Sequence, residues 1–94
     1  MTEMTFKKEK NVSDSDAVQY DKENNVLYVK LSNKDVSQTR ALDDLRLVDY
    51  DSENQPAGIE FISASDGLDL ADAPAAKRIQ KLLTEAGIDF PVFA

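Results

Sequence analysis

The sequence predicts an α+β fold in which a four- or five-stranded antiparallel β-meander packs one face against a single C-terminal helix. Residues 17–63 contain short β-branched and aromatic runs separated by Asp, Asn and Ser clusters, which is typical of consecutive strands. The intervening segments are too short to hold crossover helices, so neighbouring strands must be antiparallel. Helical spacing of apolar residues occurs only near the C-terminus.

Five strands are expected along this segment. They are Ala17–Tyr20, Val26–Leu31, Ser37–Leu42, Arg46–Tyr50 and Ala57–Ser63. Residues 21–25, 43–44 and 51–56 lie in three of the four gaps between these runs. They are rich in Asp and Asn, which tolerate left-handed backbone and bond their own main chain. These segments are therefore predicted to be turns.

The helix is the element with the clearest pattern. Five apolar residues share one helical face, namely Ala75, Ile79, Leu82, Leu83 and Ala86. Asp72 is expected to accept hydrogen bonds from the first free amides, and Pro74 suits the first turn. Gly87 is expected to end the helix in the left-handed conformation.

The two ends of the chain differ in character. Residues 1–15 mix charges with few apolar residues, which predicts a flexible arm, although Met4 and Phe6 leave an added strand open. Residues 16–94 are predicted to form a single domain. Its last residues, Ile88–Ala94, are apolar and should pack on the domain, with Pro91 confining them to an edge or an extended strap.

Composition narrows the chemistry available to the chain. Its 94 residues include 18 Asp and Glu against 11 Lys and Arg, giving a net charge of −7, and they include no Cys, His or Trp. Residues 11–73 hold fourteen acidic and five basic side chains, so most of the acid lies in this segment. A cysteine or histidine catalyst, a Cys/His zinc site and a Ser-His-Asp relay are excluded for this chain alone. No catalytic residue, metal ligand or cofactor is predicted.

The same composition limits compartment and partners. Without cysteine, a signal-peptide pattern or an apolar run of membrane-spanning length, we expect a cytoplasmic protein that does not associate with membranes. Its acidity opposes contact with nucleic acid, because phosphates would be repelled. A basic protein, or a second copy of the chain, is the expected partner.

The two faces of the predicted sheet differ. Leu27, Val29, Leu31, Ile59 and Phe61 are expected to share the face that the helix covers. The opposite face is expected to mix apolar and charged residues, namely Val26, Tyr28, Val48, Tyr50, Ile62, Lys30, Arg40, Arg46 and Glu60. Such a face suits a homodimer interface, or a solvated surface on which Lys and Arg stems cover the aromatic rings.

Acidic and aromatic series each allow a ligand or a structural interpretation. Asp49, Asp51, Glu53 and Glu60 have an EF-hand-like spacing, but Asn54 replaces the required glycine and strands flank the series, so a hairpin turn is favoured. The series Asp66, Asp69, Asp72 is explained at least in part by helix capping. The three tyrosines, Tyr20, Tyr28 and Tyr50, are expected to pack across strands rather than stack on bases, since the segment that holds them is strongly acidic.

Several of these runs together resemble a known family. Tyr20–Leu31, Thr39–Asp44, Asp49–Asp51 and Gly58–Glu60 resemble the YuzE-like family of small prokaryotic proteins of unknown function, over about half the chain from Val18 to Ser65. Leu45 and Asn54 stand where the family's tight turns have glycine. The resemblance implies a compact β-rich fold and no catalytic residue or cofactor.

Taken together, these observations favour a non-enzymatic protein-interaction module that masks a basic partner, such as a small toxin-like or nucleic-acid-binding protein. The candidate binding residues are Tyr28, Tyr50, Asp43, Asp44, Asp49 and Asp51. The alternative is a domain that uses the four aspartates of that set to bind a small ligand or a divalent cation. One version of this alternative is a hydrolytic enzyme.

Overall fold

The computed structural model describes residues 17–94, and there it confirms the α+β class, the antiparallel sheet and the C-terminal helix. The arm expected over residues 1–15 lies outside the described residues. The sheet of this part has five strands, each within two residues of its predicted bounds. They are β2 (Val18–Asp21), β3 (Val26–Lys30), β4 (Gln38–Asp43), β5 (Arg46–Tyr50) and β6 (Pro56–Ile62).

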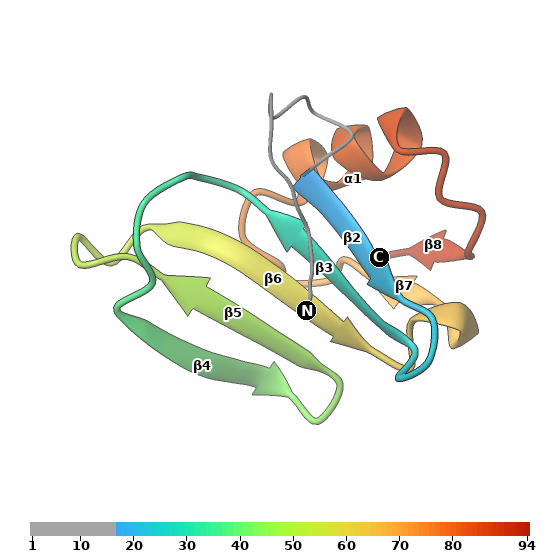
Figure 1. The fold of residues 1–94 in the computed structure, drawn as a ribbon, viewed down its shortest axis with the longest axis horizontal. Coiled ribbons are helices and arrows are strands. Elements are labelled where there is room, and N and C mark those ends of the chain that lie inside the picture. Colours follow the sequence, from blue (N-terminus) through green and yellow to red (C-terminus); the bar gives the residue numbers. More distant parts are fainter. Residues whose placement is uncertain (1–16) are drawn as a thin grey trace.

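The order of the strands is β2-β3-β6-β5-β4, and each neighbouring pair is antiparallel. Strands β4, β5 and β6 follow one another as a meander, and β2 and β3 form a hairpin. The prediction of one continuous meander is wrong at a single connection, residues 31–37, which leads from β3 past the end of β6 to the far edge of the sheet (Figure 1). Backbone amides of Leu31 and Ser32 donate to the carbonyl of Ala57 and guide this crossing.

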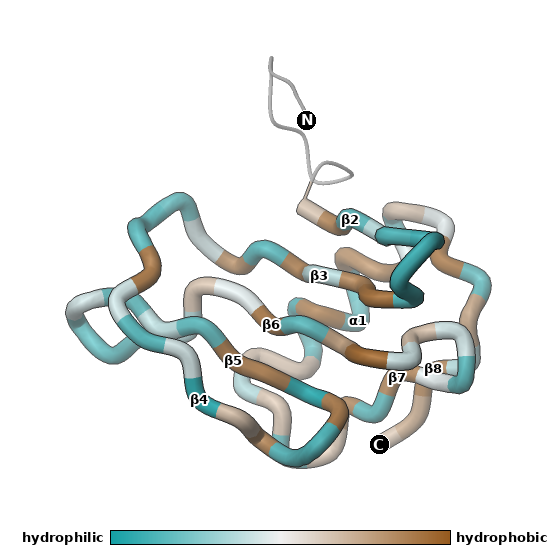
Figure 2. Tube along the Cα trace, turned by 60° about the horizontal axis from the view of Figure 1, so that its bottom comes forward, coloured by the Kyte–Doolittle hydropathy of each residue, from teal (hydrophilic) through white to brown (hydrophobic). Residues whose placement is uncertain are grey.

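The core lies between one face of the sheet and α1 (Ala76–Glu85), as the alternation of apolar residues predicts (Figure 2). Buried core residues on the five-stranded sheet are Leu27, Val29, Val48, Ile59 and Phe61, and on α1 they are Ile79, Leu82 and Leu83. Burial of a large apolar side chain stabilises the fold by about 1.5–3 kcal/mol. None of the helices in residues 17–94 has the length and apolarity that a membrane crossing requires.

The two ends of α1 are set by different means. Gly87 has a φ of 73°, its amide donates to Thr84, and the amide of Ile88 donates to Leu83, so the predicted left-handed ending is confirmed. The expected cap by Asp72 is wrong. The residue that precedes α1 is Ala75, itself left-handed with a φ of 56°, and no side chain caps the helix there.

The C-terminal tail is an extended strap, as its apolar sequence predicts. Residues Val92–Phe93 form β8, which pairs in parallel with β7 (Leu68–Asp69). Upstream of β8, the ring of Phe90 meets Tyr20 edge to face, with 4.9 Å between ring centroids. The tail therefore contacts both β2 and the segment that follows η2 (Ala64–Asp66), on the β2 side of the sheet (Figure 1).

Candidate functional site

One face of the sheet is packed against α1, and within the described part of the chain no helix or strand covers the other. We call this second surface the open face. The register places these residues on it: Gln19, Asp21, Val26, Tyr28, Lys30, Thr39, Ala41, Leu47, Asp49, Gly58, Glu60 and Ile62. Val26, Tyr28, Leu47 and Ile62 are only partly buried. The prediction that the second face mixes apolar and charged residues is confirmed.

The membership of that face was predicted wrongly for two strands. Val48 is 2% exposed in the core, and Arg46 and Tyr50 lie on its side of β5, because strand residues alternate. Arg40 pairs with Val48 and also belongs to this side. On β5 it is Leu47 and Asp49 that reach the open face.

A hydrogen-bonded row crosses the open face over four strands. The hydroxyl of Tyr28 on β3 donates to Oδ2 of Asp49 on β5 at 2.9 Å, and the hydroxyl of Thr39 on β4 donates to Oδ1 of the same carboxylate at 2.5 Å. Between them lies Gly58 on β6, where a Cβ would stand 1.9 Å from the Tyr28 hydroxyl oxygen. The row therefore depends on the missing side chain at residue 58.

This environment holds Tyr28 in its neutral form. Burial of the phenol raises the pKa of Tyr28 well above its ordinary value of 10.0, and the hydrogen bond to Asp49 and the charges of Asp49 and Glu60 raise it further. Tyr28 is thus a hydrogen-bond donor at neutral pH and not a source of phenolate. The row can recognise polar groups, but nothing in it is poised as a nucleophile.

Asp43 lies on the other side of the sheet, at the turn between β4 and β5. Its Oδ2 accepts from Nη2 of Arg46 at 2.7 Å and from Nε at 3.1 Å. Nη1 of Arg46 donates to the carbonyls of Asp69 at 2.9 Å and Ala71 at 2.5 Å. The Arg46 hydrogen bond holds the pKa of Asp43 below its usual range, and Asp43 in turn raises the pKa of Arg46. We interpret this pair as a clamp between the sheet and the segment before α1.

The remaining candidates do not join these groups. Asp44 lies in the β4–β5 turn, at the opposite end of β5 from Asp49. Asp51, 4% exposed, begins the β5–β6 turn, where its Oδ1 accepts from the amides of Glu53 and Gln55. In the same turn Asn54 takes the left-handed φ of 64° that favours glycine. The turn interpretation of the EF-hand-like spacing is confirmed.

Tyr50 is separated from Tyr28 by the sheet itself. The guanidinium of Arg40 lies 4.5 Å from the centre of the Tyr50 ring, and Arg40 also donates to Oδ1 of Asn54 at 2.7 Å. Of the six predicted binding residues, the structure brings only Tyr28 and Asp49 together. In residues 17–94 no three acidic side chains are placed to hold a metal ion jointly.

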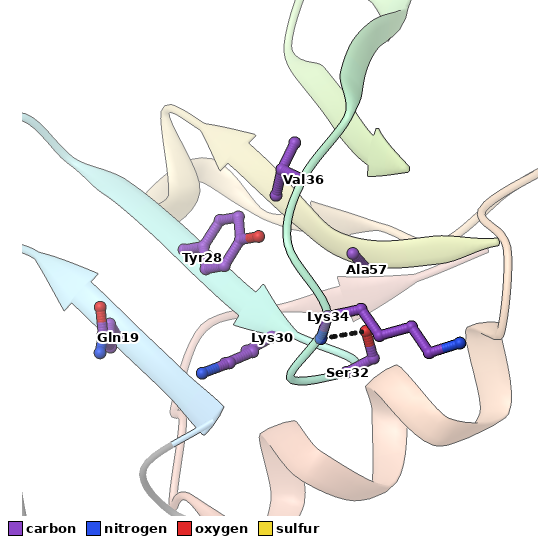
Figure 3. A pocket seen from close by; sticks show the side chains of 7 residues that line it. All are labelled: Gln19, Tyr28, Lys30, Ser32, Lys34, Val36 and Ala57. Carbon is purple, nitrogen blue, oxygen red and sulfur yellow. Dashed lines mark hydrogen bonds between the residues drawn. The ribbon is translucent and has the colours of Figure 1, made fainter. Parts of the chain in front are cut away.

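Sequence reasoning missed a hollow beside Tyr28. It has a volume of about 270 Å³ and lies where the connection 31–37 leaves β3 (Figure 3). Its lining residues are Gln19, Tyr28, Lys30, Ser32, Lys34, Val36 and Ala57. The signal in the sequence is weak, because Ser32, Lys34 and Val36 belong to a connection without periodic pattern. Gly58 and Thr39 were missed as well, because their roles depend on Tyr28 and Asp49, which lie on neighbouring strands.

These features define a small α+β protein whose sheet carries a helix on one face and a polar row on the other. The chain belongs to a protein family of unknown function (DUF2283), whose family model matches residues 17–65, just over half of the chain. The matched segment contains β2 to β6, and with them the whole open face, while α1 and β8 follow it. Searches among curated proteins and among solved structures found no match.

Proposed function

We propose that the protein is a non-enzymatic interaction module whose open face binds a basic partner protein. The observation that carries the proposal is the exposed sheet surface itself, on which partly buried apolar side chains alternate with charged ones. Its charged members are Asp21, Asp49 and Glu60 against Lys30, so the face is acidic like the chain as a whole. Apolar area with complementary charge is the usual composition of a specific interface.

The neighbours of Glu60 mark the centre of this proposed interface. Glu60 pairs with Tyr28 on one side and with Leu47 on the other, so one carboxylate stands between an aromatic and an aliphatic side chain. A Lys or Arg of the partner would meet Glu60 while its stem packs on these two neighbours. Asp49 is held in place by two donated hydrogen bonds and adds a second, oriented carboxylate.

The narrower family and the cellular compartment are part of the same proposal. We place the chain with the YuzE-like proteins on the resemblance of Tyr20–Leu31, and in the cytoplasm on the lack of cysteine. In this proposal the chain masks a small toxin-like or nucleic-acid-binding protein, because a small acidic protein is suited to cover a basic one. The carboxylate-plus-cation alternative has less support, since Asp43 and Asp44 lie at the other end of β5 from Asp49 and Asp51.

A tagged pull-down of the full chain from its native host tests this proposal, quantified by mass spectrometry against an acidic control protein of matched charge. We expect one basic protein in stoichiometric amount on the chain and not on the control. Light scattering on the purified chain accompanies it. Recovery of the chain alone, together with a dimer by light scattering, would overturn the basic partner in favour of a homodimer.

A further inference from the structure

The hollow beside Tyr28 differs in charge from the chain as a whole. The protein carries −7 overall, yet the charged residues that line the hollow are Lys30 and Lys34, and none of its described lining residues is acidic. Gln19, Ser32 and Tyr28 add polar side chains around the same space (Figure 3). A cationic hollow on an acidic protein suits an anion, because binding there gains charge attraction that the surrounding surface would not give.

Two carboxylates accept hydrogen bonds from residues that line the hollow. Oε1 of Glu53, on the β5–β6 turn, accepts from Nζ of Lys34 at 2.6 Å, and both side chains are more than half exposed. Asp49 accepts from Tyr28 and Thr39. Lys34 therefore already binds a carboxylate at this rim. An exposed ion pair of this kind is weak, so an incoming anion can compete for the ammonium.

The hollow also has an apolar wall. Val36 is 50% exposed although it stands on the connection above the ring of Tyr28, and Ala57 lines the same space (Figure 3). The volume of about 270 Å³ is slightly below the roughly 300–1,000 Å³ of sites for drug-sized ligands. A ligand that fills it is therefore small.

We propose that this hollow binds a small organic carboxylate with an apolar body, such as an aromatic acid. The body lies between Val36 and the ring of Tyr28, and Lys30 and Lys34 turn their ammonium groups to the carboxylate. In Figure 3 these two side chains point away from each other, so both must swing inward when the anion binds. This inference is separate from the basic-partner proposal, because it concerns a small molecule and the hollow lined by Lys30 and Lys34.

The test is an NMR titration of the ¹⁵N-labelled full chain with sodium benzoate, at constant ionic strength. We expect saturable shifts of the amides of Lys30, Ser32, Lys34 and Val36. Sodium acetate, which lacks the apolar body, and benzyl alcohol, which lacks the charge, should each bind about tenfold more weakly or worse. Inorganic phosphate binding as tightly as benzoate would overturn the assignment of an organic ligand.

Two double variants complete the test. Lys30→Ala with Lys34→Ala should weaken benzoate binding about tenfold or more, since both ammonium groups are lost. Lys77→Ala with Lys81→Ala removes the same charge from α1, outside the hollow, and should leave the titration unchanged. Equal weakening by both pairs would show a general charge effect and overturn the proposal. Shifts scattered over the chain without saturation would overturn it as well.

Discussion

The ring of Tyr28 occupies the space that a side chain at residue 58 would fill. A Cβ built on Gly58 would stand 1.9 Å from the Tyr28 hydroxyl oxygen and 2.4 Å from Cζ. Gly58 does not have a left-handed backbone, so its requirement for glycine comes from the neighbouring strand alone. The glycine lets Tyr28 reach across β6 to Asp49, and this places a tyrosine hydrogen bond at the centre of the open face.

Gly58→Ala should therefore lower the free energy of unfolding by about 1–3 kcal/mol, because the phenol must leave Asp49. In a Tyr28→Ala background the same substitution should be neutral or stabilising by up to about 1 kcal/mol, since alanine costs less backbone entropy than glycine in a strand. Urea unfolding of the four proteins of this cycle measures the coupling. Additive effects would mean that the ring does not depend on Gly58.

Arg46→Ala should lower the free energy of unfolding by about 2–4 kcal/mol, because two partly buried carbonyls and a carboxylate lose the buried guanidinium that donates to them. The guanidinium joins Asp43 to the carbonyls of Asp69 and Ala71, which are more than twenty residues further along the chain. Arg78→Ala, on the polar side of α1, is the matched control and should change stability by no more than about 0.5 kcal/mol. An equal loss in both variants would contradict the clamp.

The raised pKa of Tyr28 predicts a specific alkaline instability. The unfolded chain releases this phenolic proton near its ordinary pKa of 10.0, whereas the folded chain keeps it, so the free energy of unfolding should fall as pH rises above about 10. Tyr28→Phe lacks the proton and should show a shallower decline over the same range. Urea unfolding at about pH 8, 10 and 11 makes the comparison. Parallel declines would show that Tyr28 has an ordinary pKa.

The lowered pKa of Asp43 predicts the opposite dependence in acid. Its contribution to stability is complete well above its ordinary value of 3.8 and is lost as pH falls through the lower folded value, because protonation removes the acceptor of Arg46. Asp43→Asn should therefore be less stable than the natural chain at neutral pH, and the difference should shrink below about pH 4. A difference that stays constant from neutral to acid pH would be contrary to this account.

The parts of the fold that could be predicted from sequence are those with a clear period. Leu27, Val29 and Leu31 occupy every second position, and Ile79, Leu82 and Leu83 keep helical spacing, so the core and its two layers follow from pattern. On β5 the apolar residues Leu47 and Val48 are adjacent, and alternation alone cannot choose between them. For this reason Val48 was predicted on the open face, whereas it is Leu47 that lies there.

The other differences between prediction and structure arise where the sequence shows no local period. Arg46 is buried because its partners at residues 69 and 71 surround it, and no local pattern announces such partners. The helix begins at Ala76, and Ala75 occupies the cap position. Asp72 lies three residues before Ala75, which is too far for the predicted cap. The pair β7 and β8 is two residues long on each side, too short to give a period.

The most direct measurement of the central claim is the same pull-down made with two charge-reversed chains. Glu60→Lys reverses one carboxylate between Tyr28 and Leu47 on the open face, and Glu85→Lys makes the identical change at the end of α1. The account predicts that the basic partner stays in stoichiometric amount on Glu85→Lys and is lost from Glu60→Lys, with both variants as stable as the natural chain. Equal recovery on the two variants would contradict binding through the open face.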